Sequence, residues 1–302
     1  MSRIYVAPIS LGLGDLVASL PAIQGLISGR REGRDEIWLV ARSAGQAALA
    51  ERIDGLAGTV DEAEFDLAAS GVRFVNLRDH PLQRDHWWGL PEFDAACGPL
   101  SINDIVGQIC VDFGIPADFS RPIPLRAARR ADVADVVLLI TESDGPTKQW
   151  PMDRWAAVAA WARESGIEAR AVVRASGSAE LGDAGIGEIV APTPGATVDL
   201  LSSCRAVVGI DTGLTHIAVQ QGTPTVMLSR DRPVYFRPWP HSRVVIGSTC
   251  VAECNALERA RAYNAMTRLT GLCSPARTCP SGAPCMGAIT ASQVVAVLEE
   301  LL

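Results

Sequence analysis

The chain has 302 residues, 48% of them hydrophobic, and a formal net charge of −7 at pH 7. This length and apolar content suffice for two α/β domains of ordinary size, and no apolar run is long enough to span a bilayer. The negative charge without a basic tail argues against nucleic acid as a partner. The N-terminus lacks a signal-peptide pattern, so we expect a cytoplasmic protein.

Strands and helices are expected to alternate along the first hundred residues. Residues 4–7 read as a strand, Gly12 and Gly14 lie in the following loop, and Asp15 opens a helix that ends near residue 28. Further strands are expected over 36–41, near 60 and over 72–77, and further helices over 45–53, 62–69 and 101–113. This alternation predicts a parallel, doubly wound sheet. Asp15 either caps its helix or places a carboxylate at the mouth of a cleft.

The loop over residues 79–92 interrupts this pattern. It brings together Arg84, His86, Trp87 and Trp88. Exposed aromatic and basic side chains on a loop often bind a ligand, which makes these four residues candidates for an acceptor loop. Tryptophans that fix the loop to the core are the alternative interpretation.

The α/β pattern restarts after a linker over residues 121–132, which holds two prolines and an arginine cluster. Strands are expected over 136–140, 168–173, 206–210 and 225–228 and around Ile189, and helices over 151–165, 178–183, 199–204 and 291–302, the last capped by Thr290. Both halves therefore favour an α/β domain with a parallel sheet.

Lys148 is the only lysine in the chain. Ammonium and guanidinium groups differ in size, hydration and donor geometry, so a lone lysine marks a candidate site where arginine does not fit. Retention of one lysine by chance on the surface is the alternative. Lys148 lies in the loop after the expected strand 136–140, at the carboxyl end of that strand.

The stretch from residue 206 to 228 reads as strand, turn, helix, turn and strand. Asp211, Thr212 and Gly213 form the first turn, and Thr212 can cap the helix that Gly222 and Pro224 end. A helix N-terminus at the carboxyl end of a parallel strand offers free N–H groups and a partial positive charge, which suit a phosphate group. An ordinary βαβ turn is the alternative.

Four segments together resemble glycosyltransferase family 9, the heptosyltransferases of lipopolysaccharide assembly and their relatives. They are Leu13-Gly-Asp15 with Leu20-Pro21, Lys148-Gln-Trp150-Pro151, Asp211 to His216, and Cys285-Met286 with Ile289-Thr290. The resemblance implies a GT-B fold, in which two Rossmann-like domains face a cleft. It implies an acceptor-side domain over 1–128, a nucleotide-sugar domain over 129–289, and a final helix over 290–302 that packs back on the first domain.

The resemblance also implies roles for individual residues. Asp15 matches the general base, Lys148 and Thr147 match groups that stabilise the departing diphosphate, and Asp211 matches a ligand of sugar hydroxyls. The remaining donor-binding positions are the backbone of Thr212, Gly213 and Leu214, with Glu180 on the ribose, and His216, which either touches phosphate or packs. Such an enzyme needs no cofactor for catalysis, and the family implies ADP-heptose as the donor.

Five of the eight cysteines fall between residues 250 and 285. Cys254, Cys273, Cys279 and Cys285 resemble the iron-holding cysteines of autotransporter heptosyltransferases in the same family, and Cys250 could replace Cys254. A structural iron or zinc site with four thiolate ligands is one interpretation. Buried free thiols, which are common in cytosolic proteins, are the other.

The resemblance therefore predicts an inverting glycosyltransferase that transfers a heptose-type sugar to an acceptor hydroxyl. The acceptor stays open among a glycan such as lipopolysaccharide core, a protein and a small molecule, because its domain is the part least similar to the family. A GT-B nucleotide-sugar epimerase and a non-catalytic nucleotide-sugar-binding module are the alternatives.

Overall fold

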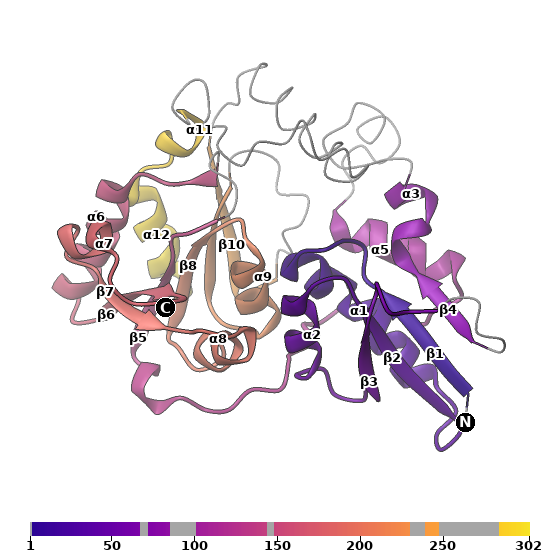
Figure 1. Ribbon diagram of the computed structural model, residues 1–302. Helices are drawn as coiled ribbons and strands as arrows, with labels where there is room; N and C mark the ends of the chain where they lie inside the picture. Colours follow the sequence, from indigo (N-terminus) through magenta and orange to yellow (C-terminus); the bar gives the residue numbers. More distant parts are fainter. Residues whose placement is uncertain (1, 67–71, 85–100, 144–147, 230–238, 248–283) are drawn as a thin grey trace, which may run out of the picture.

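The computed structural model describes residues 2–66, 72–84, 101–143, 148–229, 239–247 and 284–302. The strands of one sheet are β1 (Ser2–Ala7), β2 (Asp35–Ala41), β3 (Gly58–Asp61) and β4 (Arg73–Asn76), in the order β3-β2-β1-β4. The strands of the other are β5 (Val136–Ile140), β6 (Glu168–Val173), β7 (Gly187–Val190), β8 (Ala206–Ile210), β9 (Thr225–Ser229) and β10 (Ser242–Ile246), in the order β10-β9-β8-β5-β6-β7. The strand pairs in both sheets are parallel, and the two sheets form two lobes side by side (Figure 1).

In the first lobe, α1 (Leu13–Gly29) and α5 (Ile102–Asp112) share one core with the sheet, to which β1 contributes Ile4 and Val6. The alternate residue of β1, Tyr5, points to the other face and lies 4.8 Å, centroid to centroid, from Phe65. Phe65 also packs on Phe74, so the segment from residue 62 to 66 forms a turn that brings this ring to the sheet. The helix expected over 62–69 is therefore wrong for its described part.

The remaining elements of the first lobe are short. They are α2 (Ala44–Ala50), the 3-10 helix η1 (Leu77–Asp79) and α3 (Pro81–Arg84). The described helices, in both lobes, include none that is both long and apolar enough to cross a membrane.

The second sheet is covered by helices on both faces, as the continuous apolar strands predict. Leu138 and Ile140 of β5 belong to the core that contains α8 (Pro194–Leu201) and α9 (Gly213–Gln220). Val137 and Leu139 belong to the opposite core, with α6 (Met152–Glu164). The short α7 (Ala179–Asp183) precedes β7, and the 3-10 helix η2 (Ala131–Val133) precedes β5.

Helix α8 begins at Pro194, five residues before the start expected from the sequence. Thr193 caps it by accepting a hydrogen bond from the Ala196 N–H (3.1 Å), and Pro194 occupies the first turn, where a missing N–H costs nothing. Thr-Pro was therefore a readable start signal that the apolar pattern alone did not reveal.

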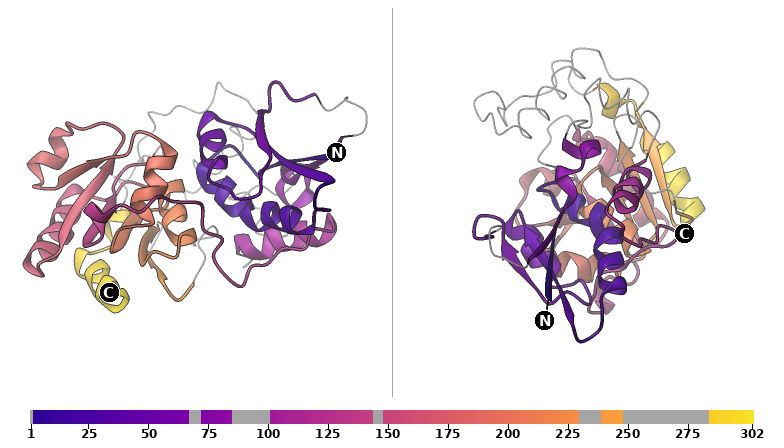
Figure 2. Two further views of the ribbon diagram at one scale, coloured as in Figure 1. Left: turned by 90° about the horizontal axis from the view of Figure 1, so that it is seen from below. Right: turned by 90° about the vertical axis from the view of Figure 1, so that its right-hand side faces the viewer.

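The final helix differs from the expectation that it packs back on the first domain. Helix α12 (Ala291–Leu301) packs on α6, β9 and β10 of the second lobe, where Figures 1 and 2 both place it. Val294 and Leu298 are buried in the same core as Trp155, and the Trp161 indole N–H donates to Glu299 (3.0 Å). The apolar side chains of α12 are therefore buried against α6 within the second lobe.

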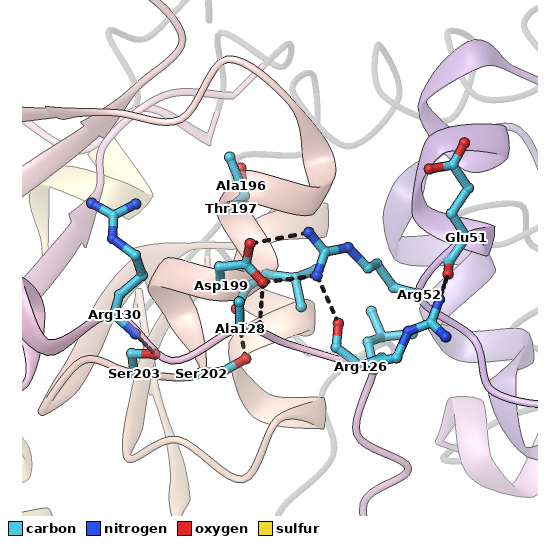
Figure 3. A network of polar contacts seen from close by, with 12 residues as sticks. Glu51, Arg52, Arg126, Ala128, Arg130, Ala196, Thr197, Asp199, Ser202 and Ser203 are labelled. Carbon is cyan, nitrogen blue, oxygen red and sulfur yellow. Dashed lines mark hydrogen bonds and ion pairs between the residues drawn. The ribbon is translucent and has the colours of Figure 1, made fainter.

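The two lobes are joined on one side by a polar network (Figure 3). Arg52, just after α2, donates through both terminal nitrogens to the Asp199 carboxylate of α8 (2.9 and 3.0 Å). The connecting chain is tied into the same network, since the Ala128 N–H donates to Asp199 (2.7 Å) and Arg52 donates to the Arg126 carbonyl (3.2 Å). A bidentate pair of this kind fixes orientation as well as distance between the lobes.

Candidate active site

The start of α1 in the first lobe lies directly against the start of α9 in the second. A Cβ atom on Gly213 would lie 2.8 Å from the Leu13 Cβ and 2.9 Å from the Gly14 nitrogen, closer than real Cβ contacts come. Glycine at both positions lets the two backbones meet. Because each helix N-terminus carries a partial positive charge, two positive ends converge at the junction between the lobes.

Asp15 lies in the first turn of α1, just after the loop that connects β1 to this helix. Its Oδ2 accepts a hydrogen bond from the Gly12 N–H (2.9 Å), so Asp15 also caps its helix. The loop is held by Gln46, whose side-chain amide donates to the carbonyls of Ser10 (2.8 Å) and Gly12 (2.9 Å). The cap and the cleft interpretations of Asp15 are therefore compatible.

The electrostatic surroundings of Asp15 suit a base. Burial raises the pKa of its carboxyl above the ordinary 3.8, while the Gly12 hydrogen bond and the charges of His216, Lys148 and Arg78 oppose that rise. A raised pKa makes a carboxylate a better proton acceptor, as general base catalysis near neutral pH requires. Asp15 thus lies within the field of cations from both lobes.

Arg78 is a residue of this site that the sequence analysis missed. It lies in η1, directly after β4, and β4 pairs in parallel with β1. The carboxyl ends of the two strands therefore lie at the same sheet edge, which brings the Arg78 charge close enough to act on Asp15. Its position after a strand next to the strand that leads to Asp15 was the signal available in the sequence.

Lys148 and Asp211 meet because they follow β5 and β8, which the structure shows to be neighbouring parallel strands. The Lys148 Nζ lies 2.9 Å from Asp211 Oδ2 and 3.1 Å from the Asp211 carbonyl oxygen. On the other side, His216 Nε2 lies 2.9 Å from Asp211 Oδ1. Burial would raise the pKa of Asp211, but the Lys148 ammonium and the His216 ring outweigh burial and hold that pKa well below its usual range.

The tryptophan of the Lys148-Gln-Trp-Pro segment fixes the Lys148 loop. Trp150 is buried, packs edge-to-face on Trp155 (4.8 Å between centroids), and donates its indole N–H to the Ile289 carbonyl (3.0 Å). The neighbouring Gln149 side chain donates to the Ser143 carbonyl (3.0 Å) across the loop. The large, buried Trp150 side chain, two residues after Lys148, thereby holds the Lys148 backbone at the edge of the sheet.

Thr212 precedes α9, but its hydroxyl does not cap the helix, contrary to the expectation. The Thr212 Oγ1 is buried and makes no hydrogen bond within the described part of the chain. The N–H groups at the start of α9 are consequently not taken by this side chain. Gly213 and Leu214 open the helix itself, and Leu214 packs partly buried against the core.

The other predicted residues have separate outcomes. Glu180 is exposed in the first turn of α7, after β6 at the same sheet edge as Lys148, and Arg84 ends α3. Cys285 is buried in α11 (Pro284–Gly287). Outside the described residues lie Thr147, His86, Trp87, Trp88, Cys250, Cys254, Cys273 and Cys279. Among the residues that are described, no three His, Cys, Asp or Glu side chains are grouped as metal ligands.

Two lobes with parallel sheets, whose carboxyl-end loops meet at one site, are the arrangement of the GT-B fold, and comparisons with known proteins agree. Residues 118–264 match the family model of glycosyltransferase family 9 (heptosyltransferase). The resemblance seen in the sequence is thus confirmed: the protein is a glycosyltransferase with a family 9 domain. A search among curated proteins found no match.

Solved structures show the same fold at low sequence identity. The chain is similar to a family 9 glycosyl transferase from Veillonella parvula (15% identity, TM-score 0.67, covering 99% of this chain and 97% of that one). It is also similar to E. coli heptosyltransferase WaaC with ADP-2-deoxy-2-fluoro heptose (12% identity, TM-score 0.62, 99% and 100% covered). A third is the iron-containing dodecameric glycosyltransferase TibC from enterotoxigenic E. coli (17% identity, TM-score 0.67, 99% and 76% covered).

Proposed function

We propose that the protein is an inverting glycosyltransferase that moves a heptose-type sugar from ADP-heptose to an acceptor hydroxyl. The observation that carries the proposal is the joint placement of Lys148, Asp211 and His216 at the start of α9, within the field of Asp15 from the other lobe. Solved structures of WaaC and TibC contain an ADP-heptose analogue and ADP-D-beta-D-heptose, which supports this class of donor.

The proposed reaction is a direct displacement at the anomeric carbon. Asp15 takes the proton from the acceptor hydroxyl as its oxygen attacks, and the bond from the anomeric carbon to the diphosphate oxygen breaks. The diphosphate leaves with the electron pair of that bond. Positive charge already in place stabilises this leaving group, and it comes from Lys148 and the N–H groups that open α9. Thr147 would add a hydroxyl, and Glu180 would bind the ribose.

We assign the two lobes different tasks. The first, over residues 1–128, binds the acceptor, and the second, over 129–289, binds the donor. The acceptor is a glycan, a protein or a small molecule with a free hydroxyl. The residues proposed for the acceptor loop are Arg84, His86, Trp87 and Trp88. We also propose a cytoplasmic location and a structural iron or zinc on Cys254, Cys273, Cys279 and Cys285, for which the iron of TibC is the support.

Thermal unfolding with a panel of nucleoside diphosphates and their sugars tests the function. Any ligand that binds only the folded protein stabilises it by about 2.7 kcal/mol at a hundred times its Kd, so the correct nucleotide raises the Tm by several degrees. We expect ADP and ADP-heptose to do so. Lys148→Ala should abolish this rise, whereas Arg121→Ala, on an exposed side chain that is not among the proposed site residues, should leave it intact. A panel without any stabilising nucleotide would refute the proposal.

A further inference from the structure

We propose that Gln46 is a positioning residue for the transfer reaction, which fixes the direction of the Gly12 N–H toward Asp15. The inference rests on the proposed function, in which Asp15 is the general base. Gln46 lies in the first turn of α2, and its side chain is fully buried. A buried polar side chain needs hydrogen-bond partners, and those of the Gln46 amide are backbone groups of its own turn and of the loop before Asp15.

Three successive carbonyls of the loop before α1 are held from the start of α2. The Gln46 amide donates to the Ser10 carbonyl (2.8 Å) and to the Gly12 carbonyl (2.9 Å), which uses both of its N–H groups. The Leu11 carbonyl between them accepts from the Ser43 hydroxyl (3.0 Å). The Leu11 side chain is 47% exposed, so its packing does little to hold the loop. The hydrogen bonds from Ser43 and Gln46 therefore hold this part of the chain.

The peptide group between Leu11 and Gly12 is the one that reaches the base. Its carbonyl accepts from the Ser43 hydroxyl, and its N–H donates to Asp15 Oδ2 (2.9 Å). The peptide groups on either side of it are the two that Gln46 holds, so rotation of the middle peptide would disturb both of those contacts. Gln46 thereby acts on Asp15 through the Gly12 N–H, as supporting groups do when they preorganise a site.

The hydrogen bond from Gly12 has two consequences for Asp15 as a base. It fixes the direction of the carboxylate, and it stabilises the charged form, which lowers the pKa of Asp15 against the effect of burial. The charges of His216, Lys148 and Arg78 also lower that pKa. A change that loosens only the Gly12 N–H should therefore raise the pKa of Asp15 while these charges stay in place. The same change should slow proton transfer, which depends on hydrogen-bond geometry.

The pH profile of transfer by Gln46→Met tests the inference. Methionine has nearly the same length and donates no hydrogen bond, so the Ser10 and Gly12 carbonyls each lose a partner. We expect kcat to fall about 10- to 100-fold, because a small misplacement of a reacting group can cost that much. The acid limb of kcat/KM should move to higher pH. An acid limb that stays in place would overturn the inference, because the loss of rate would then not come through Asp15.

Gln221→Met is the matched control. The Gln221 amide also holds a backbone segment, since it accepts from the Leu125 N–H (3.0 Å) and donates to the Leu125 carbonyl (3.1 Å). This variant should lower the Tm, as Gln46→Met does, without moving the acid limb, and an equal movement in both variants would overturn the inference. Gln46→Asn serves if Gln46→Met folds poorly. Its amide is one methylene too short to reach both carbonyls, so the acid limb should move in the same direction.

Amide exchange tests the holding role without any substrate. NMR follows the exchange of the Gly12 N–H with water, which should be severalfold faster in Gln46→Met than in the wild type and unchanged in Gln221→Met. An unchanged rate in Gln46→Met would refute the role of Gln46 by itself.

ADP binding separates this inference from the proposed function. The Kd of ADP should be the same in the wild type and in Gln46→Met, because the groups proposed for the diphosphate lie in the second lobe. Weaker binding of ADP by Gln46→Met would contradict an effect confined to Asp15. Failure of the wild type to bind any nucleoside diphosphate would instead refute the proposed function, so the two failures are distinguishable.

Discussion

Gly213 and Gly14 bring the two lobes into backbone contact: a Cβ on Gly213 would lie 2.9 Å from the Gly14 nitrogen. The starts of α1 and α9 meet there. Asp15 follows Gly14 directly, and Asp211, which pairs with Lys148, lies two residues before Gly213. The spacing between base and leaving-group site therefore depends on two residues that lack side chains.

We expect Gly213→Ala to lower transfer activity at least about tenfold, because the methyl group would push α1 and α9 apart, and a misplacement of about 1 Å can cost that much or more. Gly14→Ala should be milder, since its Cβ would meet His216 only at 3.4 Å. Initial rates and Tm values of both variants give the comparison. Gly182→Ala is the control, because no atom lies within 4 Å of its Cβ position and alanine favours the helix. Full activity in Gly213→Ala would contradict the importance of this contact.

Asp15→Asn should abolish transfer, with a loss of about 100- to 10,000-fold in kcat, because the general base is removed while the Gly12 hydrogen bond can persist. ADP binding should remain. The same variant should be more stable than the wild type at pH 7. Burial raises the pKa of Asp15 in the folded protein, so folding binds an additional proton and stability falls as pH rises from 3.8 through the raised pKa.

Thermal unfolding from pH 3 to pH 8 checks this sign. The stability gain of Asp15→Asn should be present near neutral pH and should disappear below the ordinary pKa of the carboxyl, where Asp15 is protonated in both folded and unfolded chains. A gain that is constant across this range would mean that ionisation of Asp15 is not its cause.

Arg78→Gln should move the acid limb of the pH profile of kcat/KM to higher pH. The Arg78 charge lowers the pKa of Asp15, so its removal leaves the burial effect less opposed and protonates the base at a higher pH. At alkaline pH the rate should change less, unless Arg78 also binds the acceptor, which would show as a higher acceptor KM. An acid limb that moves to lower pH would contradict the electrostatic role of Arg78.

Arg52→Ala should cost about 1 to 2 kcal/mol of folding stability, because it removes a bidentate, largely shielded pair with Asp199 and a hydrogen bond to the Arg126 carbonyl (Figure 3). Denaturant unfolding measures the loss. Arg121→Ala removes an exposed ion pair of the same chemistry and should cost less than about 0.5 kcal/mol. Equal losses of folding free energy in the two variants would show that the Arg52–Asp199 contact stabilises the protein no more than an exposed ion pair does.

The cysteine proposal predicts about one iron or zinc for each chain in elemental analysis of the purified protein. Metal removal by a chelator should lower the Tm, because a four-thiolate site contributes to folding. Cys279→Ser should lose the metal, whereas Cys110→Ser, on a buried thiol of α5, should keep it. Protein that holds no stoichiometric metal would support the alternative of free thiols.

The sequence by itself determined the main strands of the described second half of the chain and the residues that we propose for the donor site. Strands 136–140, 168–173 and 206–210 lie where apolar runs predicted them, and Lys148 and Asp211 follow two strands that prove to be neighbours. Parallel strands that share an edge bring their following loops together, so this part of the site is a consequence of pattern and topology.

Only the tertiary structure decided which groups share a partner and where distant elements pack. In the turn over residues 62–66, Phe65 packs on Tyr5, and α12 packs on α6 in the second lobe, where its Val294 and Leu298 share a core with Trp155. The pairing of both Asp211 oxygens and the reach of the Arg78 charge to Asp15 likewise depend on contacts between residues far apart in sequence. Local propensity carries no information on such contacts, since side-chain packing across the fold selects them.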